Sequence, residues 1–510
     1  MKKVFLKASF IIFLSNVLCY FFGYLKEALI VKNFGASNLT DAWYLVSNIP
    51  NFIFKFSFFG ALSASFVPVF VDYLKKNKER EAWQIASSII NFTFLVALSV
   101  TIFCIIFSKS IIFIFAPGFD KNTSLVASKL LDIAIISLPF IAIVGFLESI
   151  YRLYFKYFYT AFSQLINAIV FIIFLNLFIF HFKILATSLS LVISYFFSFL
   201  FLAFILFKNY KNLYTFKISF FHPAFRGIFK LMLPLIGAEI IGKSISTVDG
   251  IFASFLDKGS ITTLSLANRI INFPTIFIAT TLNTAIFPIF ANLAEDRKRE
   301  EFQDTFDFSF KISLGLIFFV IIIFILFSHQ IVAILFERGN FTHQFSLIAA
   351  KLILILSPVL ISYSIRPILA SICYSFKMNW LLFKFELLGF ILNIILDYIL
   401  MRLFGVFGIA LATTIVVSAM VIYLFFNVKR KLLFETKLLV IFLVKITLAS
   451  LLTVIFCHYL FKLFKIVSFS PIKLILYTFI VFLIYIFGLF LFKIEEIEQL
   501  WRLIVKKKLN

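Results

Sequence analysis

Long apolar runs, separated by short charged segments, follow one another along almost the whole chain. A run of 18 or more such residues is long enough to cross the hydrocarbon core of a bilayer as a helix. The pattern therefore predicts an all-α integral membrane protein with about 14 transmembrane helices. The expected spans lie near residues 8–31, 41–72, 84–113, 125–151, 158–180, 184–207, 231–256, 262–292, 308–328, 345–374, 381–403, 406–426, 437–461 and 470–492.

Several of these runs exceed the thickness of a bilayer and contain proline. Proline removes a backbone hydrogen bond from a helix, and an overlong span has to tilt, bend or leave the hydrocarbon. We therefore expect irregular helices where the long runs carry Pro50, Pro68, Pro139, Pro274, Pro288 and Pro358.

The composition excludes a water-soluble globule, because 62% of the residues are hydrophobic and only 14% are charged. The net charge of +23 does not indicate a nucleic-acid partner, since the basic residues lie in short connections between the apolar runs. Roughly 27 Lys and Arg fall on one face of the expected topology and about 9 on the other. The positive-inside rule then places both termini in the cytoplasm of an inner-membrane protein.

Signatures of covalent chemistry are missing from the sequence. There is no phosphate-binding loop, no His-Glu-x-x-His and no nucleophile elbow, and the five histidines are scattered. The four cysteines lie singly in apolar stretches, as structural core residues do. We therefore expect a transporter and no enzyme, driven by an ion gradient, the membrane potential or the substrate gradient.

The chain also repeats itself. The segments Phe115–Gly118 and Phe336–Gly339 are 221 residues apart, and Pro68 precedes Pro288 by 220. A period near 220 covers six spans and preserves their orientation, which predicts two parallel six-helix lobes with a site between them near mid-membrane. The expected division is 1–215 for the first lobe, 216–430 for the second, and 431–510 for two further helices and an amphipathic C-terminal tail.

Ionisable side chains inside the expected spans are candidates for function, because charge is unfavourable in hydrocarbon. Two alternatives stay open. Lys55, Arg152, Arg366 and Lys384 lie near an interface, where they can extend their charges to water. Neighbouring Lys26 and Glu27 can neutralise each other structurally. The full set is Lys26, Glu27, Asp41, Lys55, Glu148, Arg152, Glu239, Lys243, Asp249, Arg269, Arg366, Lys384, Glu386 and Asp397.

Two groups in the second half point to ions. Arg269 has no acid within one helical turn, so it faces water or an anionic ligand, or forms a structural ion pair with a distant acid. Asn393 and Asp397 are four residues apart and share a helix face. With Asp249 they offer the oxygen ligands that small hard cations prefer. A buried polar helix contact explains the same residues equally well.

At this point the residues resemble those of a known family, the MurJ (MviN) lipid II flippases of the multidrug/oligosaccharidyl-lipid/polysaccharide exporter superfamily. The similarity covers the first twelve spans. Its motifs are Gly23–Glu27, Phe34–Ala36, Thr40–Ala42, Pro50-Asn51, Gly60–Pro68, Ala116–Phe119, Ala253–Leu256, Ala267–Arg269, Phe273-Pro274, Leu335–Thr342 and Gly408–Thr413.

The resemblance implies a cationic central cavity between the lobes and alternating access that carries undecaprenyl-diphosphate-linked peptidoglycan precursor outward. It implies substrate binding by Lys26, Glu27, Asp41, Lys55 and Arg269. It also implies a sodium site at Asp249, Asn393, Asp397 and Thr413, with Na⁺ or H⁺ as coupling ion and no other cofactor. The expected partners are lipid II or a similar polyprenyl-diphosphate glycolipid, the bilayer, and proteins of cell-wall synthesis.

The sequence departs from the family pattern at positions that bear on substrate. Family arginines are replaced near Tyr20 and at Phe54, and Lys26 stands where the family has an arginine. Lysine lacks the bidentate fork that arginine offers a diphosphate. The alternatives are therefore a flippase for another polyprenyl-linked oligosaccharide and a multidrug/cation antiporter of the same superfamily, which needs an acidic cavity.

Overall fold

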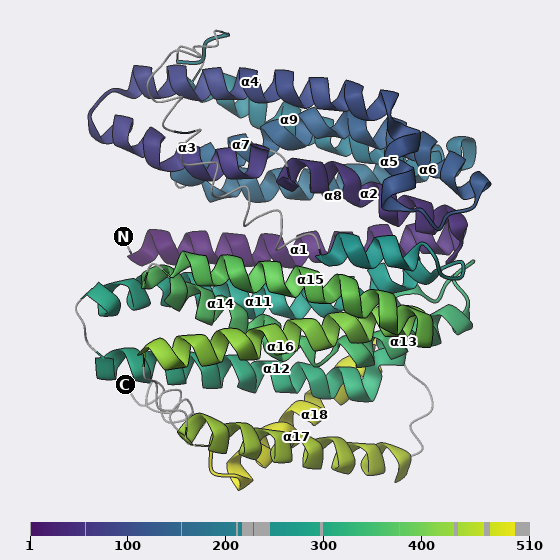
Figure 1. Ribbon diagram of the computed structural model, residues 1–510, viewed down its shortest axis with the longest axis vertical. Helices are drawn as coiled ribbons and strands as arrows, with labels where there is room; N and C mark the ends of the chain where they lie inside the picture. Colours follow the sequence, from purple (N-terminus) through teal and green to yellow (C-terminus); the bar gives the residue numbers. More distant parts are fainter. Residues whose placement is uncertain are drawn as a thin grey trace. The chain divides into compact units, whose positions relative to one another are not determined.

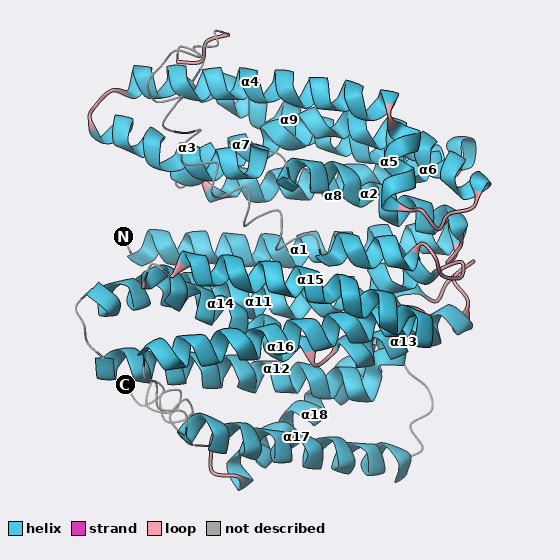
Figure 2. Cartoon of the chain, viewed as in Figure 1, coloured by secondary structure: helices cyan, strands magenta, loops and turns pink. Residues whose placement is uncertain are grey.

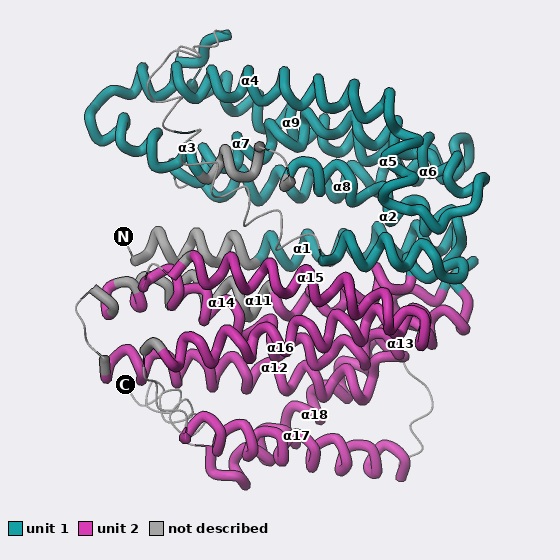
Figure 3. The backbone as a smooth tube through the Cα atoms, viewed as in Figure 1, with its two compact units in different colours: residues 1–262, 338–341 teal, residues 263–337, 342–510 magenta. Residues whose placement is uncertain are grey.

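The computed structural model is helical, with no strand among the residues it describes (Figures 1 and 2). These residues form two compact units, one of 1–262 with 338–341 and one of 263–337 with 342–510 (Figure 3). The described backbone covers 2–56, 58–154, 156–210, 213–216, 228, 245–295, 299–376, 378–432, 437–463 and 470–494.

Unit 1 is a bundle of long helices with connecting short ones. Helix α8 packs along both α9 and α1, while α2 packs on α6 and α4 on α7. Its aromatic core contains Phe66, Phe70, Trp83 and Tyr151. The helices are α1 (Lys2–Phe34), α2 (Asn38–Phe56), α3 (Phe58–Lys75), α4 (Glu79–Ile106), α5 (Ser108–Phe115), α6 (Lys121–Ala134), the 3₁₀ turn η1 (Ile135–Ser137), α7 (Leu138–Leu153), α8 (Tyr157–Phe182) and α9 (Leu185–Tyr210).

Unit 2 is a second bundle, in which α12 contacts α13, α14 and α17, and α15 packs along α16. Helix α11 begins with three residues that belong to unit 1 and continues in unit 2. The helices are α11 (Ser260–Glu295), α12 (Arg299–Phe336), α13 (His343–Leu356), α14 (Val359–Ser375), α15 (Asn379–Phe404), α16 (Val406–Leu432), α17 (Lys437–Leu463) and α18 (Pro471–Leu491).

The prediction of an all-α membrane protein is confirmed, whereas the count of about 14 spans is not. Among the described residues, 10 helices are long and apolar enough to cross a membrane, or up to 11 if one bent pair is a single span. One reason is that the run 41–72 is divided into the shorter helices α2 and α3. Another is that most of the expected span 231–256 lies outside the described residues, as does the expected C-terminal tail from 495 onward.

Proline accounts for two of the irregular spans. Helices α13 and α14 meet at an angle of 44° around Pro358. The turn η1 separates α6 from α7 directly before Pro139. In contrast, α11 runs through both Pro274 and Pro288 as one continuous helix. Proline in a long run therefore marks a break at two sites but does not enforce one everywhere.

The lengths of the helices repeat along the chain. Helices α6 and α13 both have 14 residues, and α8 and α15 both have 26. Each 14-residue helix is followed by a break and a helix of 16 or 17 residues. The helix boundaries thus show the same internal periodicity as the sequence motifs. The three-part division at 215 and 430 stays a prediction, because the two compact units are divided elsewhere.

Candidate functional site

Lys26 and Glu27 form a buried charge pair in α1. The ammonium of Lys26 lies 3.5 Å from Oε1 of Glu27 and 4.7 Å from the ring centre of Phe171 in α8. The hydroxyl of Tyr44 donates a hydrogen bond of 2.7 Å to Oε2 of Glu27. Glu27 is 3% exposed and Lys26 is 22% exposed. The carboxylate is therefore held from two sides, while the ammonium keeps a path to surrounding solvent.

Asp41 in α2 caps the beginning of α11. Its two carboxylate oxygens accept hydrogen bonds from the backbone N–H of Gly259 (2.7 Å), the N–H of Thr262 (2.8 Å) and the hydroxyl of Thr262 (2.6 Å). The first N–H groups of a helix have no partner within that helix, and negative charge at this end is favourable. Asp41 thus fastens a segment more than 200 residues away in sequence to the start of α2. Its expected role in substrate binding stays a prediction.

Three further close approaches join loops of unit 1. The backbone N–H of Asn340 donates to the carbonyl of Lys32 (2.9 Å), and its side-chain amide donates to the carbonyl of Asn33 (2.6 Å). The N–H of Gly118 donates to the hydroxyl of Ser254 (3.2 Å). We call the segments 32–41, 116–120, 254–262 and 338–341 the loop cluster. Its members precede or follow α1, α2, α5, α6, α11 and α12, so they gather the ends of many helices.

Two glycines make the loop cluster possible. A Cβ at Gly339 would lie 2.4 Å from the carbonyl oxygen of Lys32, and the φ of Gly339 is +61°. A Cβ at Gly118 would lie 2.5 Å from the carbonyl oxygen of Ser254. Both glycines belong to the repeated segments Phe115–Gly118 and Phe336–Gly339. The repeat therefore marks places where backbone meets backbone.

The other predicted substrate residues are placed less completely. Arg269 lies in α11 of unit 2 and is partly buried. Lys55 belongs to the last turn of α2, but its side chain lies outside the described residues. Lys26 and Arg269 belong to different units. Their expected joint action on one ligand accordingly stays a prediction.

Two of the arginines that were expected to reach an interface have acidic partners instead. Arg152 donates to Glu148 at 2.9 Å, and Gln164 adds a longer contact to the same carboxylate. Arg366 forms an ion pair with Glu386 and lies over the ring of Phe385. Pairing neutralises charge that would otherwise be unfavourable in a membrane. Lys384 is exposed on α15, as expected for a side chain that reaches outward.

The residues of the expected sodium site are deeply buried. Asn393 and Asp397 are both 0% exposed, and the amide of Asn393 donates to Oδ2 of Asp397 at 2.6 Å. Thr413 in α16 is also buried, and its hydroxyl donates to the carbonyl of Ile409. Asp249 is buried in unit 1. Amide, carboxylate and hydroxyl oxygens suit Na⁺, so the side chains fit the expected ligand chemistry.

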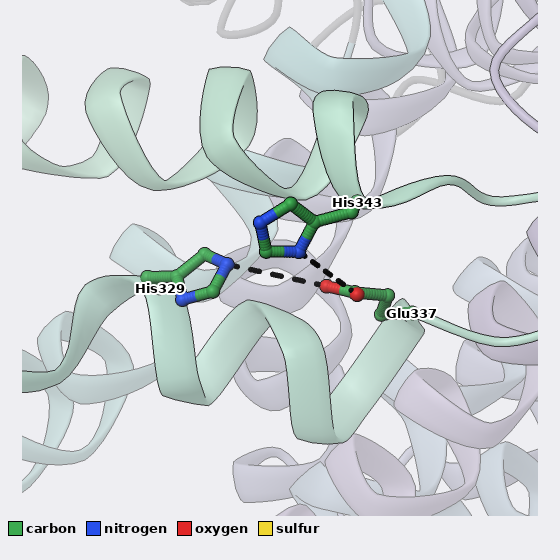
Figure 4. A group of neighbouring side chains, drawn as sticks. All are labelled: His329, Glu337 and His343. Carbon is green, nitrogen blue, oxygen red and sulfur yellow. Dashed lines mark hydrogen bonds and ion pairs between the residues drawn. The ribbon is translucent and has the colours of Figure 1, made fainter. Parts of the chain in front are cut away.

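A cluster that the sequence did not predict lies at the turn between α12 and α13. Nδ1 of His343 is 3.0 Å from Oε1 of Glu337, and Nε2 of His329 is 4.0 Å from Oε2 (Figure 4). Burial raises the pKa of Glu337, but interactions with Ser346, His343 and His329 outweigh it and lower this pKa below its ordinary value. The scattered histidines hid this cluster because its members are 8 and 6 residues apart and meet only through a helix end and a turn.

Comparison with known proteins gives a consistent result. A family model described as "Lipid II flippase MurJ" matches residues 30–480. The chain is 29% identical over 420 residues to a probable lipid II flippase MurJ from Buchnera aphidicola subsp. Schizaphis graminum, covering 80% of each protein. A solved structure titled "Lipid II flippase MurJ, inward closed conformation" matches with a TM-score of 0.80 and 27% identity, over 96% of this chain and 99% of that one.

A more distant solved structure shares the fold. It is an inward-facing multidrug resistance transporter of the MATE family, with a TM-score of 0.71 and 14% identity, and the match covers 81% of this chain and 94% of that one. This likeness concerns architecture alone.

Proposed function

Because the chain belongs to the MurJ family of lipid II flippases, we propose that it moves undecaprenyl-diphosphate-linked peptidoglycan precursor from the cytoplasmic to the periplasmic leaflet by alternating access. It is a multi-pass inner-membrane protein. The proposed topology has both termini in the cytoplasm, since the basic connections lie on that face of the expected spans.

The observation that carries the proposed capture step is the unequal exposure of Lys26 and Glu27. Glu27 is occupied by Tyr44, while the Lys26 ammonium is the more exposed partner of a pair 3.5 Å apart. A diphosphate oxygen can therefore approach the ammonium from solvent without first exposing the buried acid. In a region of low dielectric a doubly charged anion attracts this ammonium strongly. Lys26 would then act as a point charge for the diphosphate, with Arg269 as a second cation.

The loop cluster supports a closed outer end in the proposed cycle. On the proposed topology, the connections 32–41, 116–120, 254–262 and 338–341 all face the periplasm. Asp41 holds the start of α11, and the turn at Asn340 is bonded to the end of α1. Opening toward the periplasm would break these hydrogen bonds. Their modest individual strength, about 0.5–1.5 kcal/mol each, is compatible with a reversible gate.

The transport step needs no covalent chemistry from this chain. The lipid tail would remain in the bilayer while the charged headgroup crosses beside Lys26 and Arg269. The membrane potential contributes about 2.3 kcal/mol per charge per 100 mV to a charged carrier. A bound Na⁺ would supply positive charge that changes with the cycle, and Asn393, Asp397 and Thr413 would hold it, with Asp249 as a further carboxylate. H⁺ on Asp397 is the alternative coupling ion.

A complementation experiment tests this function. Arg269→Ala should abolish growth of a flippase-depleted strain while the variant is still expressed in the membrane. Normal growth of that variant would remove Arg269 from the mechanism. Rescue of the strain by the wild-type chain separates lipid II from other polyprenyl-linked oligosaccharides, because a flippase for another oligosaccharide would not restore peptidoglycan synthesis.

A further inference from the structure

The turn between α12 and α13 carries three side chains with the chemistry of a transition-metal site. His329 lies in the last turns of α12, Glu337 directly follows that helix, and His343 is the first residue of α13. One ligand atom from each lies within 4.8 Å of the other two. Figure 4 shows the two imidazole rings directed toward the carboxylate from opposite sides.

The present distances are close to those that a metal would impose. Zinc bonds to nitrogen and oxygen are about 2.0–2.2 Å long, so tetrahedral geometry places two such ligand atoms about 3.3 Å apart. The two observed nitrogen–oxygen separations are 3.0 Å and 4.0 Å. Small rotations of the rings would make both fit, without movement of either helix.

One atom of the cluster has an unmet requirement. Nε2 of His329 is buried and has no hydrogen-bond partner among the described residues, and at 4.0 Å from Glu337 it is too far away for a hydrogen bond. Buried polar atoms in proteins almost always have a partner. A metal ion between the three side chains would satisfy this nitrogen. His343 is 61% exposed, which leaves access for the ion and a position for a water ligand.

We propose that His329, Glu337 and His343 form a binding site for a zinc ion. Two imidazoles and one carboxylate are a ligand set that zinc prefers, whereas Mg²⁺ and Ca²⁺ prefer oxygen ligands alone. The ion would link the end of α12 to the beginning of α13. It would thereby fix the turn whose residues 338–341 contact Lys32 and Asn33 in the loop cluster. The site does not depend on the proposed transport of lipid II.

The test uses the full-length chain in detergent, purified with an affinity tag that contains no histidine. Binding of Zn²⁺ alone is measured by competition with a fluorescent chelator, and Co²⁺ replaces zinc for visible spectroscopy. The wild-type protein should bind one Zn²⁺ per chain and show the visible bands of four-coordinate cobalt. His329→Ala and His343→Ala should each weaken binding by at least about tenfold, since metal affinity depends on each ligand and its orientation.

His181→Gln is the matched control, because His181 is an exposed histidine at the end of α8 and lies outside the cluster. It should bind zinc like the wild type. Thermal unfolding, with and without zinc, checks that each variant is folded. Equal zinc affinity in the wild type and in the double variant H329A/H343A would overturn the proposal, and so would failure of the wild type to bind zinc at micromolar concentrations. Either result would leave the cluster as a hydrogen-bonded helix connection.

Discussion

Asp41 and Lys26 are charged residues of the same unit, yet their surroundings give them different roles. The carboxylate of Asp41 is 5% exposed on a whole-residue basis and accepts three hydrogen bonds from Gly259 and Thr262. The ammonium of Lys26 has a longer contact with Glu27 and remains more exposed. Charge saturated by backbone donors holds structure, whereas charge paired loosely with a neighbour remains available to a ligand. The same type of sequence signal, an ionisable residue in an apolar run, thus covers both roles.

The largest effect is expected at Lys26. Lys26→Ala should abolish complementation of a flippase-depleted strain, because it removes the ammonium proposed to meet the diphosphate and leaves Glu27 without its cation. Lys384→Ala is the matched control, a lysine on a membrane helix whose side chain is exposed. It should support normal growth. Growth of Lys26→Ala at the wild-type rate would mean that the contrast with Asp41 has no functional meaning.

The next effect concerns the loop cluster that Asp41 belongs to. Gly339→Ala introduces a Cβ 2.4 Å from the carbonyl oxygen of Lys32 at a φ of +61°. Strain of this kind costs about 1–2 kcal/mol before the steric clash is counted. We expect a clearly lower midpoint of thermal unfolding in detergent.

Gly315→Ala provides the comparison, since no atom lies within 4 Å of a Cβ at that position in α12. It should leave the unfolding midpoint unchanged or slightly raised, because alanine favours helix. If the two alanine variants unfold at the same temperature, the close approach of the turn to α1 does not contribute to stability.

Asp41→Asn separates a structural fastener from a substrate ligand. The amide keeps one acceptor oxygen but turns a donor group toward one of the N–H groups that Asp41 now accepts. The free energy of unfolding should fall by about 1–3 kcal/mol, with transport reduced and not abolished. A variant with wild-type stability and no transport would instead assign Asp41 to the substrate.

A smaller effect is expected from the buried pair in unit 2. Na⁺ should raise the unfolding midpoint of the wild type relative to K⁺ at equal ionic strength, because a ligand that binds only the folded state stabilises it. Asp397→Asn should lose most of this difference, since it removes the carboxylate beside Asn393. A Na⁺ effect of equal size in the variant would exclude Asp397 as a ligand.

The smallest effect should come from Lys26→Arg. Arginine keeps the positive charge and offers two parallel donors to a diphosphate. Complementation should therefore remain close to that of the wild type. Loss of growth with normal expression would show that the site is shaped around the compact ammonium beside Phe171 and Glu27.

Hydrophobic patterning was sufficient to predict most helices, because a membrane span needs a minimum length of apolar residues wherever it occurs. The predicted runs 158–180 and 381–403 correspond closely to α8 and α15. The same pattern could not show that the run 41–72 is two helices. Hydropathy measures how apolar a segment is, and it does not report where its backbone hydrogen bonds break.

The sequence identified charged positions more readily than their partners. Lys26 and Glu27 are neighbours, so their pairing could be proposed from spacing. The ion pair of Arg366 with Glu386, the capping of α11 by Asp41 and the cluster around Glu337 could not. These contacts join different helices or turns, and their formation depends on packing that no local pattern encodes.

The most direct test of the central claim is the leaflet distribution of the lipid-linked peptidoglycan precursor in cells depleted of this protein. A membrane-impermeant reagent applied to intact spheroplasts would label only precursor in the outer leaflet. We predict that the precursor stays in the inner leaflet after depletion, and that the wild type and Lys384→Ala restore labelling while Lys26→Ala does not. Labelling of the depleted cells at the wild-type rate would contradict the account.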